Sequence, residues 1–160
     1  MINKKIKFKN LELIVYDFDG VMTDNKVFID SNGNEMVLVN RGDGLAIEEL
    51  KKIGIKQLIL SSEHNLVVSA RAKKVDLPFV QGEKNKKLRL EKYCNENDIL
   101  LENVAYIGND INDLEAMKTC GFKFCPNDAN IGIKSTCDYV LKTNGGDGVI
   151  RELYDMLTES

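Results

Sequence analysis

Histidine and closely spaced cysteines are scarce in this chain, which argues against a zinc site. The only histidine is His64, and the four cysteines, Cys94, Cys120, Cys125 and Cys137, include no CxxC pair. Zinc sites in proteins need Cys and His ligands at short spacings. We therefore expect reduced, partly buried thiols, as is usual in a cytosolic protein.

The chain also lacks long apolar runs and any excess of positive charge. No apolar segment approaches the roughly 20 residues that span a bilayer. The basic start, MINKKIKFKN, is not followed by the apolar region of a secretory signal. The net charge is −3 and the isoelectric point is near 5.3, which argues against general nucleic-acid binding. We expect a cytoplasmic protein that binds neither membranes nor nucleic acids.

Prolines are few, and nothing in the sequence marks a boundary between domains. Only Pro78 and Pro126 occur, and there is no linker, low-complexity tract or internal repeat. A chain of 160 residues can bury a proper core on its own. We therefore predict a single domain that spans residues 1–160.

Short apolar strands alternate with helical patterns along the chain. Strands are expected at residues 11–16, 55–60, 79–80, 104–107, 122–124 and 139–141. Helices are expected at residues 43–53, with Asp43 as the N-terminal cap, and at 64–74, 84–95, 110–118 and 149–157. This alternation predicts an α/β fold in which helices cover both faces of a central parallel sheet.

Residues 26–40 interrupt the alternation and predict a β-hairpin. Two apolar segments, 27–29 and 35–39, flank the sequence DSNGN at 30–34, which is typical of a hairpin turn. We expect this hairpin to form a small flap. No insertion is large enough for a separate cap domain.

Acidic residues follow the first predicted strand, where residues 14–24 read IVYDFDGVMTD. In an extended chain, residues i and i+2 point to the same side, so Asp17 and Asp19 face one way. Two like charges at a partly desolvated sheet edge repel strongly. Either a positive group lies between them or one of them is protonated.

A second acidic motif, GNDIND at residues 108–113, follows the strand predicted at 104–107. Asn109, Asp110 and Asp113 place oxygen atoms at the same edge of the sheet, and a helix would put the two aspartates on one face. Oxygen ligands without His or Cys favour Mg²⁺. Because Mg²⁺ keeps several waters, not every one of these aspartates has to bind it directly.

These motifs together resemble the haloacid dehalogenase (HAD) superfamily. DFDGVMTD resembles its first motif, DxDGxxTD, and GNDIND resembles its acidic fourth motif, GDDxND. Ser61 matches the Ser/Thr of the second motif, and Lys86 in QGEKNKK matches the lysine of the third. The ending GGDGVIREL resembles the branch of capless 2-keto-3-deoxy sugar-acid phosphatases, which includes 3-deoxy-octulosonate 8-phosphate and N-acylneuraminate 9-phosphate phosphatases. A similar domain is fused to some CMP-sialate synthetases.

The resemblance implies a Mg²⁺-dependent phosphatase with an HAD-like Rossmannoid fold. Asp17 would be the nucleophile that forms an aspartyl-phosphate, and Asp19 the general acid and base. Ser61 would donate hydrogen bonds to the phosphate, and Lys86 would neutralise its charge. If the third-motif match shifts along the basic stretch, Lys84 or Lys87 takes that role.

The implied metal ligands depart from the family at one position. Candidate ligands are Asp17, Asp19 through its backbone carbonyl, Asn109, Asp110 and Asp113. Asn109 stands where the family usually has Asp, so it would bind Mg²⁺ with one negative charge fewer. Alternatively Asp110 or Asp113 replaces it, or the domain is a non-catalytic relative that binds or tetramerises a cytidylyltransferase.

Residues after the second motif bear on the substrate. Ser62 and Glu63 stand where the octulosonate enzymes typically have Gly-Arg, and Glu63 with Arg71 and Lys74 resembles the phosphatases of nine-carbon acids. Arg71 and Lys74 could hold the substrate carboxylate or could simply be surface residues. We therefore favour a nonulosonate 9-phosphate as substrate, with 3-deoxy-octulosonate 8-phosphate as the alternative.

The resemblance also implies a homotetramer in which a neighbour completes the capless site. The hairpin at 26–40 would lie at the interface. Residues 145–148 would lie near a neighbouring site, or would be a turn before the last helix. A phosphoaspartate receiver domain, also a parallel α/β unit, remains the alternative from another class.

Overall fold

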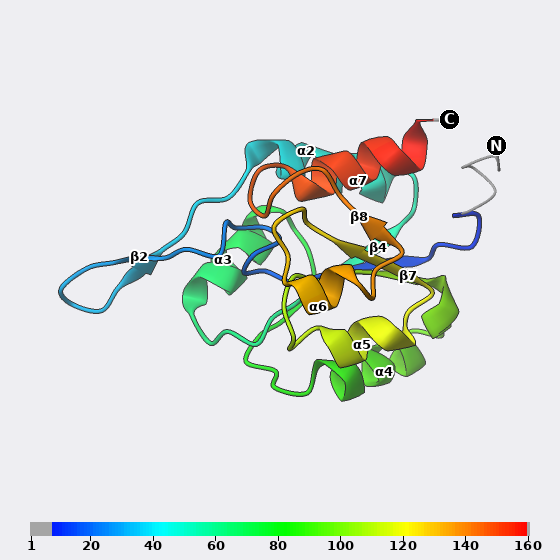
Figure 1. Ribbon diagram of the computed structural model, residues 1–160, viewed down its shortest axis with the longest axis horizontal. Helices are drawn as coiled ribbons and strands as arrows, with labels where there is room; N and C mark the ends of the chain where they lie inside the picture. Colours follow the sequence, from blue (N-terminus) through cyan, green and yellow to red (C-terminus); the bar gives the residue numbers. More distant parts are fainter. Residues whose placement is uncertain (1–7, 160) are drawn as a thin grey trace.

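The computed structural model describes residues 8–159, and six parallel strands form its central sheet (Figure 1). The strand order is β5-β4-β1-β6-β7-β8, and every neighbouring pair is parallel. The strands are β1 (Leu13–Tyr16), β4 (Lys56–Leu60), β5 (Phe79–Val80), β6 (Val104–Ile107), β7 (Phe122–Cys125) and β8 (Tyr139–Val140). The predicted α/β fold is confirmed.

Helices cover both faces of the sheet. The helices are α2 (Arg41–Lys52), α3 (Leu66–Lys74), α4 (Lys86–Glu96), α5 (Leu114–Thr119), α6 (Ile131–Lys134) and α7 (Val149–Thr158), with a short 3₁₀ turn at Leu101–Asn103. Helices α2 and α7 pack together on one face, and α4 and α5 pack together on the other (Figure 1). None of the helices within residues 8–159 has both the length and the hydrophobicity of a membrane span.

The alternation of side chains along β1 divides the core in two. Ile14 and Tyr16 belong to the cluster under α2 and α7, whereas Leu13 and Val15 belong to the cluster under α4 and α5. Parallel register places Tyr16 beside Ile59 and Ile107. The residues that follow β1, β4 and β6 therefore meet at one edge of the sheet, where α/β proteins bind ligands.

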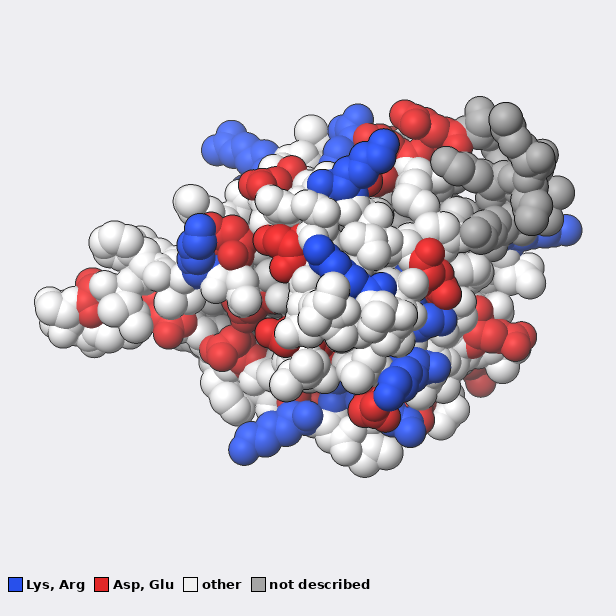
Figure 2. Space-filling view, viewed as in Figure 1, with Lys and Arg blue, Asp and Glu red and all other residues white. Residues whose placement is uncertain are grey.

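The predicted hairpin forms and projects from the body (Figure 1). Strands β2 (Phe28–Ile29) and β3 (Glu35–Met36) are antiparallel, and Asp30 Oδ1 stabilises the turn by accepting from the backbone N–H groups of Asn32 and Asn34. Several large apolar side chains of the hairpin are exposed, with Phe28 at 65% and Leu38 at 80%. Figure 2 shows few charged side chains on its visible face.

Asp43 does not cap the helix that it was predicted to begin. Asn40 is the cap of α2, since its Oδ1 accepts from the backbone N–H of Gly42. Asp43 lies buried in the first turn, and its Oδ1 accepts from the N–H groups of Ile150 and Arg151. It therefore caps α7, whose own cap residue is a glycine without a side chain.

The loop that precedes α7 packs against the loop that follows β1. Gly146 N donates to the carbonyl of Val21 at 3.0 Å, and a Cβ on Gly145 would lie only 2.1 Å from the Gly20 carbonyl oxygen. Residues 145–148, for which a position near a neighbouring site or a turn was expected, thus contact this chain's own first motif. That these residues also lie near the site of a neighbouring copy stays a prediction.

Gly145→Ala should destabilise the protein by about 1 to 3 kcal/mol, because backbone must move to admit the methyl group. Urea denaturation measures this. Gly44→Ala is the matched control, since a Cβ there meets only ordinary contacts of 3.5 Å and beyond. Alanine suits a helix better than glycine, so the control should be as stable as wild type or more so. Equal stability of both variants would contradict the close packing.

Candidate active site

A buried lysine connects the two acidic motifs. Lys86, at the start of α4, lies with its Nζ 2.8 Å from Asp17 Oδ1 and 2.7 Å from Asp113 Oδ1. Its side chain is fully buried, whereas Lys84 is exposed and Lys87 is partly exposed. A positive group next to Asp17 was one of the two alternatives that the sequence left open, and Lys86 is such a group, but it lies between Asp17 and Asp113 rather than between Asp17 and Asp19.

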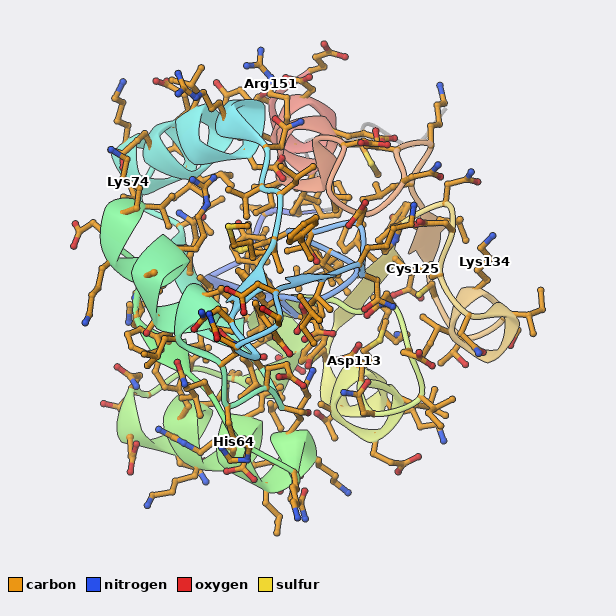
Figure 3. All side chains as sticks on the ribbon, turned by 90° about the vertical axis from the view of Figure 1, so that its left-hand side faces the viewer. His64, Lys74, Asp113, Cys125, Lys134 and Arg151 are labelled. Atoms are coloured by element: carbon orange, nitrogen blue, oxygen red, sulfur yellow. The ribbon has the colours of Figure 1, made fainter. Side chains whose placement is uncertain are left out.

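Asp113 accepts four hydrogen bonds and organises the loop around it. Besides Lys86, its Oδ1 accepts from the Tyr106 hydroxyl at 2.9 Å, and its Oδ2 accepts from the N–H groups of Asn109 and Asp110. The space above Gly108 is also taken by this side chain, since a Cβ there would lie 2.6 Å from Asp113 Cβ. In Figure 3, which faces the side where the hairpin projects, Asp113 lies beside the start of α5.

The predicted helix over 110–118 begins later than expected. Helix α5 starts at Leu114, and residues 110–113 form a turn closed by Asp113 N donating to Asp110 O. The expectation that Asp110 and Asp113 share a helix face is therefore wrong. The reason is that Asp113 turns inward to meet Lys86, while Asp110 Oδ1 accepts from the N–H of Ile111.

Burial and charge act against each other at this centre. Burial raises the pKa of Asp17 well above its ordinary value, and Asp113 raises it further, while Lys86 opposes both. Burial alone would lower the pKa of Lys86, but the two carboxylates outweigh that effect and raise it. The group of two carboxylates and one ammonium carries net negative charge, so a further cation beside it would be stabilised.

A pocket of about 150 Å³ opens over Asp17. Its lining residues are polar and come from all three strand ends and from the root of the hairpin: Asp17, Asp19, Asn25, Ser61, Ser62, Glu63, Asn109, Asp110 and Asn112. Ser61 Oγ accepts from the N–H of Glu63, so its own hydroxyl hydrogen is left to donate into the pocket. Acidic side chains also gather where the hairpin joins the body (Figure 2).

Asp19 lies at the mouth of the pocket with a raised pKa of about 6. Burial is the largest cause, Glu63 and Glu35 add to it, and Lys86 opposes it. A carboxyl group of this kind holds a proton in part near neutral pH, which the role of general acid requires.

The oxygen atoms left over at this site fit Mg²⁺. Asn109 Oδ1 is buried without a hydrogen-bond partner, and Asp17 uses Oδ1 for its hydrogen bonds with Phe18 N and Lys86. Within residues 8–159, no three Asp, Glu, His or Cys side chains form a ready metal cage. Mg²⁺ takes one or two carboxylates and keeps several waters. Asp17, the Asn109 amide and the nearby Asp110 would hold it.

Two predicted substrate residues lie away from this pocket. Arg71 Nη2 donates to the Asn40 carbonyl at 2.9 Å, which directs the guanidinium toward the start of α2. Lys74 is exposed at the periphery of the molecule in Figure 3. The structure of one chain therefore does not bring Arg71 and Lys74 to Asp17, and a neighbouring copy would have to supply them.

Two asparagines line the pocket that were not expected there. Asn112 Nδ2 donates to Ser62 Oγ at 3.2 Å and so connects the second and fourth motifs. Asn25 comes directly after DFDGVMTD, at the root of the hairpin. Their positions next to recognised motifs were the available signal, but which side chains turn inward depends on the backbone of each loop.

The sequence matches a known protein family over most of its length. Residues 45–153 match the model of the haloacid dehalogenase-like hydrolases. The chain belongs to that family. The resemblance to the HAD superfamily is thereby confirmed, and with it the expectation of a hydrolase.

Members of this hydrolase family resemble the chain over nearly its whole length. The 3-deoxy-D-manno-octulosonate 8-phosphate phosphatase of Haemophilus influenzae is 32% identical over 155 residues, covering 96% of this chain and 86% of the relative. A Streptomyces avermitilis protein assigned to the HAD family hydrolases is 42% identical with a TM-score of 0.91, covering 93% and 86% of the two chains.

A third relative was solved with ligands. The 3-deoxy-D-manno-octulosonate 8-phosphate phosphatase of Moraxella catarrhalis, in complex with magnesium ion, phosphate ion and KDO, is 29% identical with a TM-score of 0.92. The match covers 98% of this chain and 90% of that one. The fold therefore extends to a relative that holds a metal and an anion together.

Proposed function

We propose that this HAD hydrolase is a Mg²⁺-dependent phosphatase of 2-keto-3-deoxy sugar acids. The observation that carries the proposal is the Asp17 carboxylate, held by buried Lys86 at the base of a small polar pocket. At about 150 Å³, the pocket is smaller than the 300 to 1,000 Å³ of typical ligand sites, about enough for a phosphoryl group and the first atoms of its leaving group.

The arrangement supports a two-step transfer. The Asp17 carboxylate attacks phosphorus while the bond to the sugar oxygen breaks, and Asp19 gives that oxygen its proton. Ionised Asp19 then takes a proton from water, whose oxygen attacks the aspartyl-phosphate and releases inorganic phosphate and free Asp17. Ser61 donates to a phosphate oxygen, and Lys86 offsets negative charge. Bound Mg²⁺ would supply further positive charge for the phosphoryl oxygens.

The relatives favour 3-deoxy-D-manno-octulosonate 8-phosphate as the substrate. Both named phosphatases act on that compound, and one was solved with KDO. We therefore place it before the nonulosonate 9-phosphate that the sequence favoured. The nine-carbon substrate stays as the second candidate, because Glu63 lines the pocket where the octulosonate enzymes typically have arginine.

Phosphate release from the two sugar-acid phosphates, measured side by side with Mg²⁺, tests this proposal. We expect turnover of the octulosonate phosphate to exceed that of the nonulosonate phosphate, and EDTA to abolish both. The reverse order would make the second candidate the function. A lack of turnover on either compound, together with a stable complex with a cytidylyltransferase, would support the non-catalytic alternative.

We also propose that the protein works as a homotetramer joined through the hairpin. The exposed side chains of Phe28, Met36 and Leu38 support this, because apolar groups gathered on a projecting flap favour burial against a partner. A neighbour there could close the open pocket from above. Light scattering would reveal a monomer if the proposal is wrong.

Asn109→Asp should tighten Mg²⁺ binding. The new carboxylate replaces a neutral amide whose Oδ1 has no partner, and we expect half-maximal activity at an about tenfold lower Mg²⁺ concentration. Asn112→Asp is the matched control, because it adds the same charge to the same pocket at a residue that bonds to Ser62 instead. Equal shifts in both variants would show that Asn109 does not bind the metal directly.

Glu63→Gln should move the alkaline limit of kcat/KM to lower pH. Asp19 is protonated below its pKa of about 6, so the first step weakens as pH rises through that value. The Glu63 charge raises this pKa, and removing the charge lowers it. Glu35→Gln, which removes a weaker contribution of the same sign, should shift the limit in the same direction by less. An unchanged profile in Glu63→Gln would contradict the assignment.

A further inference from the structure

Asn25 has an unusual backbone for its position at the mouth of the pocket. Its φ is +66°, in the left-handed region that side chains rarely adopt and in which asparagine is several-fold enriched. Lys26 follows it directly and begins the hairpin segment. The left-handed turn at Asn25 therefore lies where the chain passes from the catalytic loop into the hairpin.

Thr23 fixes Asn25 relative to the catalytic loop. The buried Thr23 Oγ1 accepts from Gly20 N at 3.3 Å and from Asn25 N at 3.2 Å. One hydroxyl thus connects the turn after Asp19 with the backbone of Asn25. Although Asn25 is exposed, its main chain is held in place against the residues that carry the chemistry.

The side chain of Asn25 is free to bind a ligand. Only its backbone N–H takes part in a hydrogen bond within residues 8–159, yet the residue lines the pocket. Of the other two side-chain amides in the pocket, Asn112 already donates to Ser62, and the buried Asn109 oxygen is assigned above to Mg²⁺. Asn25 therefore offers an unused donor and acceptor at the rim.

The neighbouring groups indicate what such an amide would bind. Glu63, which lines the same pocket, is a carboxylate that repels anions but accepts hydrogen bonds from hydroxyl groups. Asn25 can donate to a hydroxyl oxygen or accept from its hydrogen. Because the pocket has room for only the phosphoryl group and the first atoms beyond it, those hydroxyls belong to the carbons next to the phosphate ester.

We propose that Asn25 is a substrate-binding residue, whose side-chain amide hydrogen-bonds a hydroxyl of the leaving sugar next to the phosphate. This inference rests on the proposed phosphatase function. It assigns Asn25 to recognition of the leaving group rather than to the chemical step. For substrates whose leaving group has no hydroxyl, KM should therefore not depend on the Asn25 side chain.

Asn25→Gly tests this inference, because glycine accepts a positive φ and removes only the amide. We expect KM for the sugar-acid phosphate to rise about tenfold, with kcat within about twofold of wild type. The reason is that the variant loses one hydrogen bond that is made in the ground state as well as in the transition state. KM for p-nitrophenyl phosphate should not change. Asn25→Asp, which keeps the shape but adds a negative charge, should raise both KM values.

Asn32→Gly is the matched control. Asn32 lies on the same hairpin, its side chain is outside the pocket, and the substitution should leave both KM values unchanged. An unchanged KM for the sugar-acid phosphate in Asn25→Gly, an equal fall in kcat on both substrates, or a changed oligomeric mass would overturn the inference. Absence of sugar-acid turnover in the wild-type protein would instead overturn the proposed function, and the inference with it.

Discussion

Asp17→Asn is expected to lower kcat on the sugar-acid phosphate by on the order of 10⁴-fold or more, as loss of a central catalytic group does in other enzymes. The amide is a poor nucleophile toward phosphorus and cannot form the aspartyl-phosphate. It also removes one of the two carboxylates that hold Lys86 Nζ, at 2.8 Å. Steady-state phosphate release measures the loss, and mass spectrometry of quenched enzyme should show the phosphoryl adduct only in wild type.

The control for Asp17→Asn is Asp76→Asn. Asp76 is exposed outside the pocket in a left-handed turn that asparagine also accepts, so the same chemical change should leave kcat unaltered. Near wild-type activity in Asp17→Asn would refute the nucleophile assignment. A receiver-like protein would differ in another way: acetyl phosphate would label it stably, without any turnover of sugar phosphates.

Lys86→Met is expected to destabilise the protein by about 3 to 5 kcal/mol, because it leaves buried carboxylates without their cation. Asp17 and Asp113 lie 2.8 and 2.7 Å from the ammonium that is lost, and all three side chains are buried. Activity should fall as well, since the phosphoryl group would meet two uncompensated negative charges. Urea denaturation and kcat at saturating Mg²⁺ measure the two effects.

Lys84→Met is the matched control, since Lys84 is exposed on the same basic segment and should lose neither stability nor activity. A second variant separates the charge effect from misfolding. Asp113→Asn in the Lys86→Met background removes one of the stranded charges, so the double variant should be more stable than Lys86→Met alone. A double variant no more stable than the single one would contradict the ion-pair account.

Much of the fold follows from local sequence features. The apolar segments of β1, β4 and β6 are buried strands, as is typical of a parallel sheet covered on both faces. Because the carboxyl ends of such strands meet, the order of strands and motifs along the chain is enough to place Asp17, Ser61 and Asn109 together. The hairpin is equally local, since Asp30 and the residues after it stabilise their own turn.

Interactions between segments far apart in the chain could not be predicted from the sequence. Asp43 looks like a cap for the helix in which it lies, yet it caps α7, more than 100 residues away. Asp113 matches a metal-ligand motif, yet four protein donors already use its oxygens. The helical spacing of Arg71 and Lys74 suggested that they act as a pair. It could not predict that the Arg71 guanidinium donates to the backbone carbonyl of Asn40.

The sequence by itself determined the sheet, the order of the four motifs and membership of the HAD hydrolases, because strand patterns and motif spacings are short-range properties of the chain. Only the tertiary structure decided that Lys86 joins Asp17 to Asp113, that Asp19 has a pKa of about 6 and that Asn25 lines the pocket. Those features depend on how helices and loops from separate parts of the chain pack at the sheet edge, where burial sets the strength of every charge.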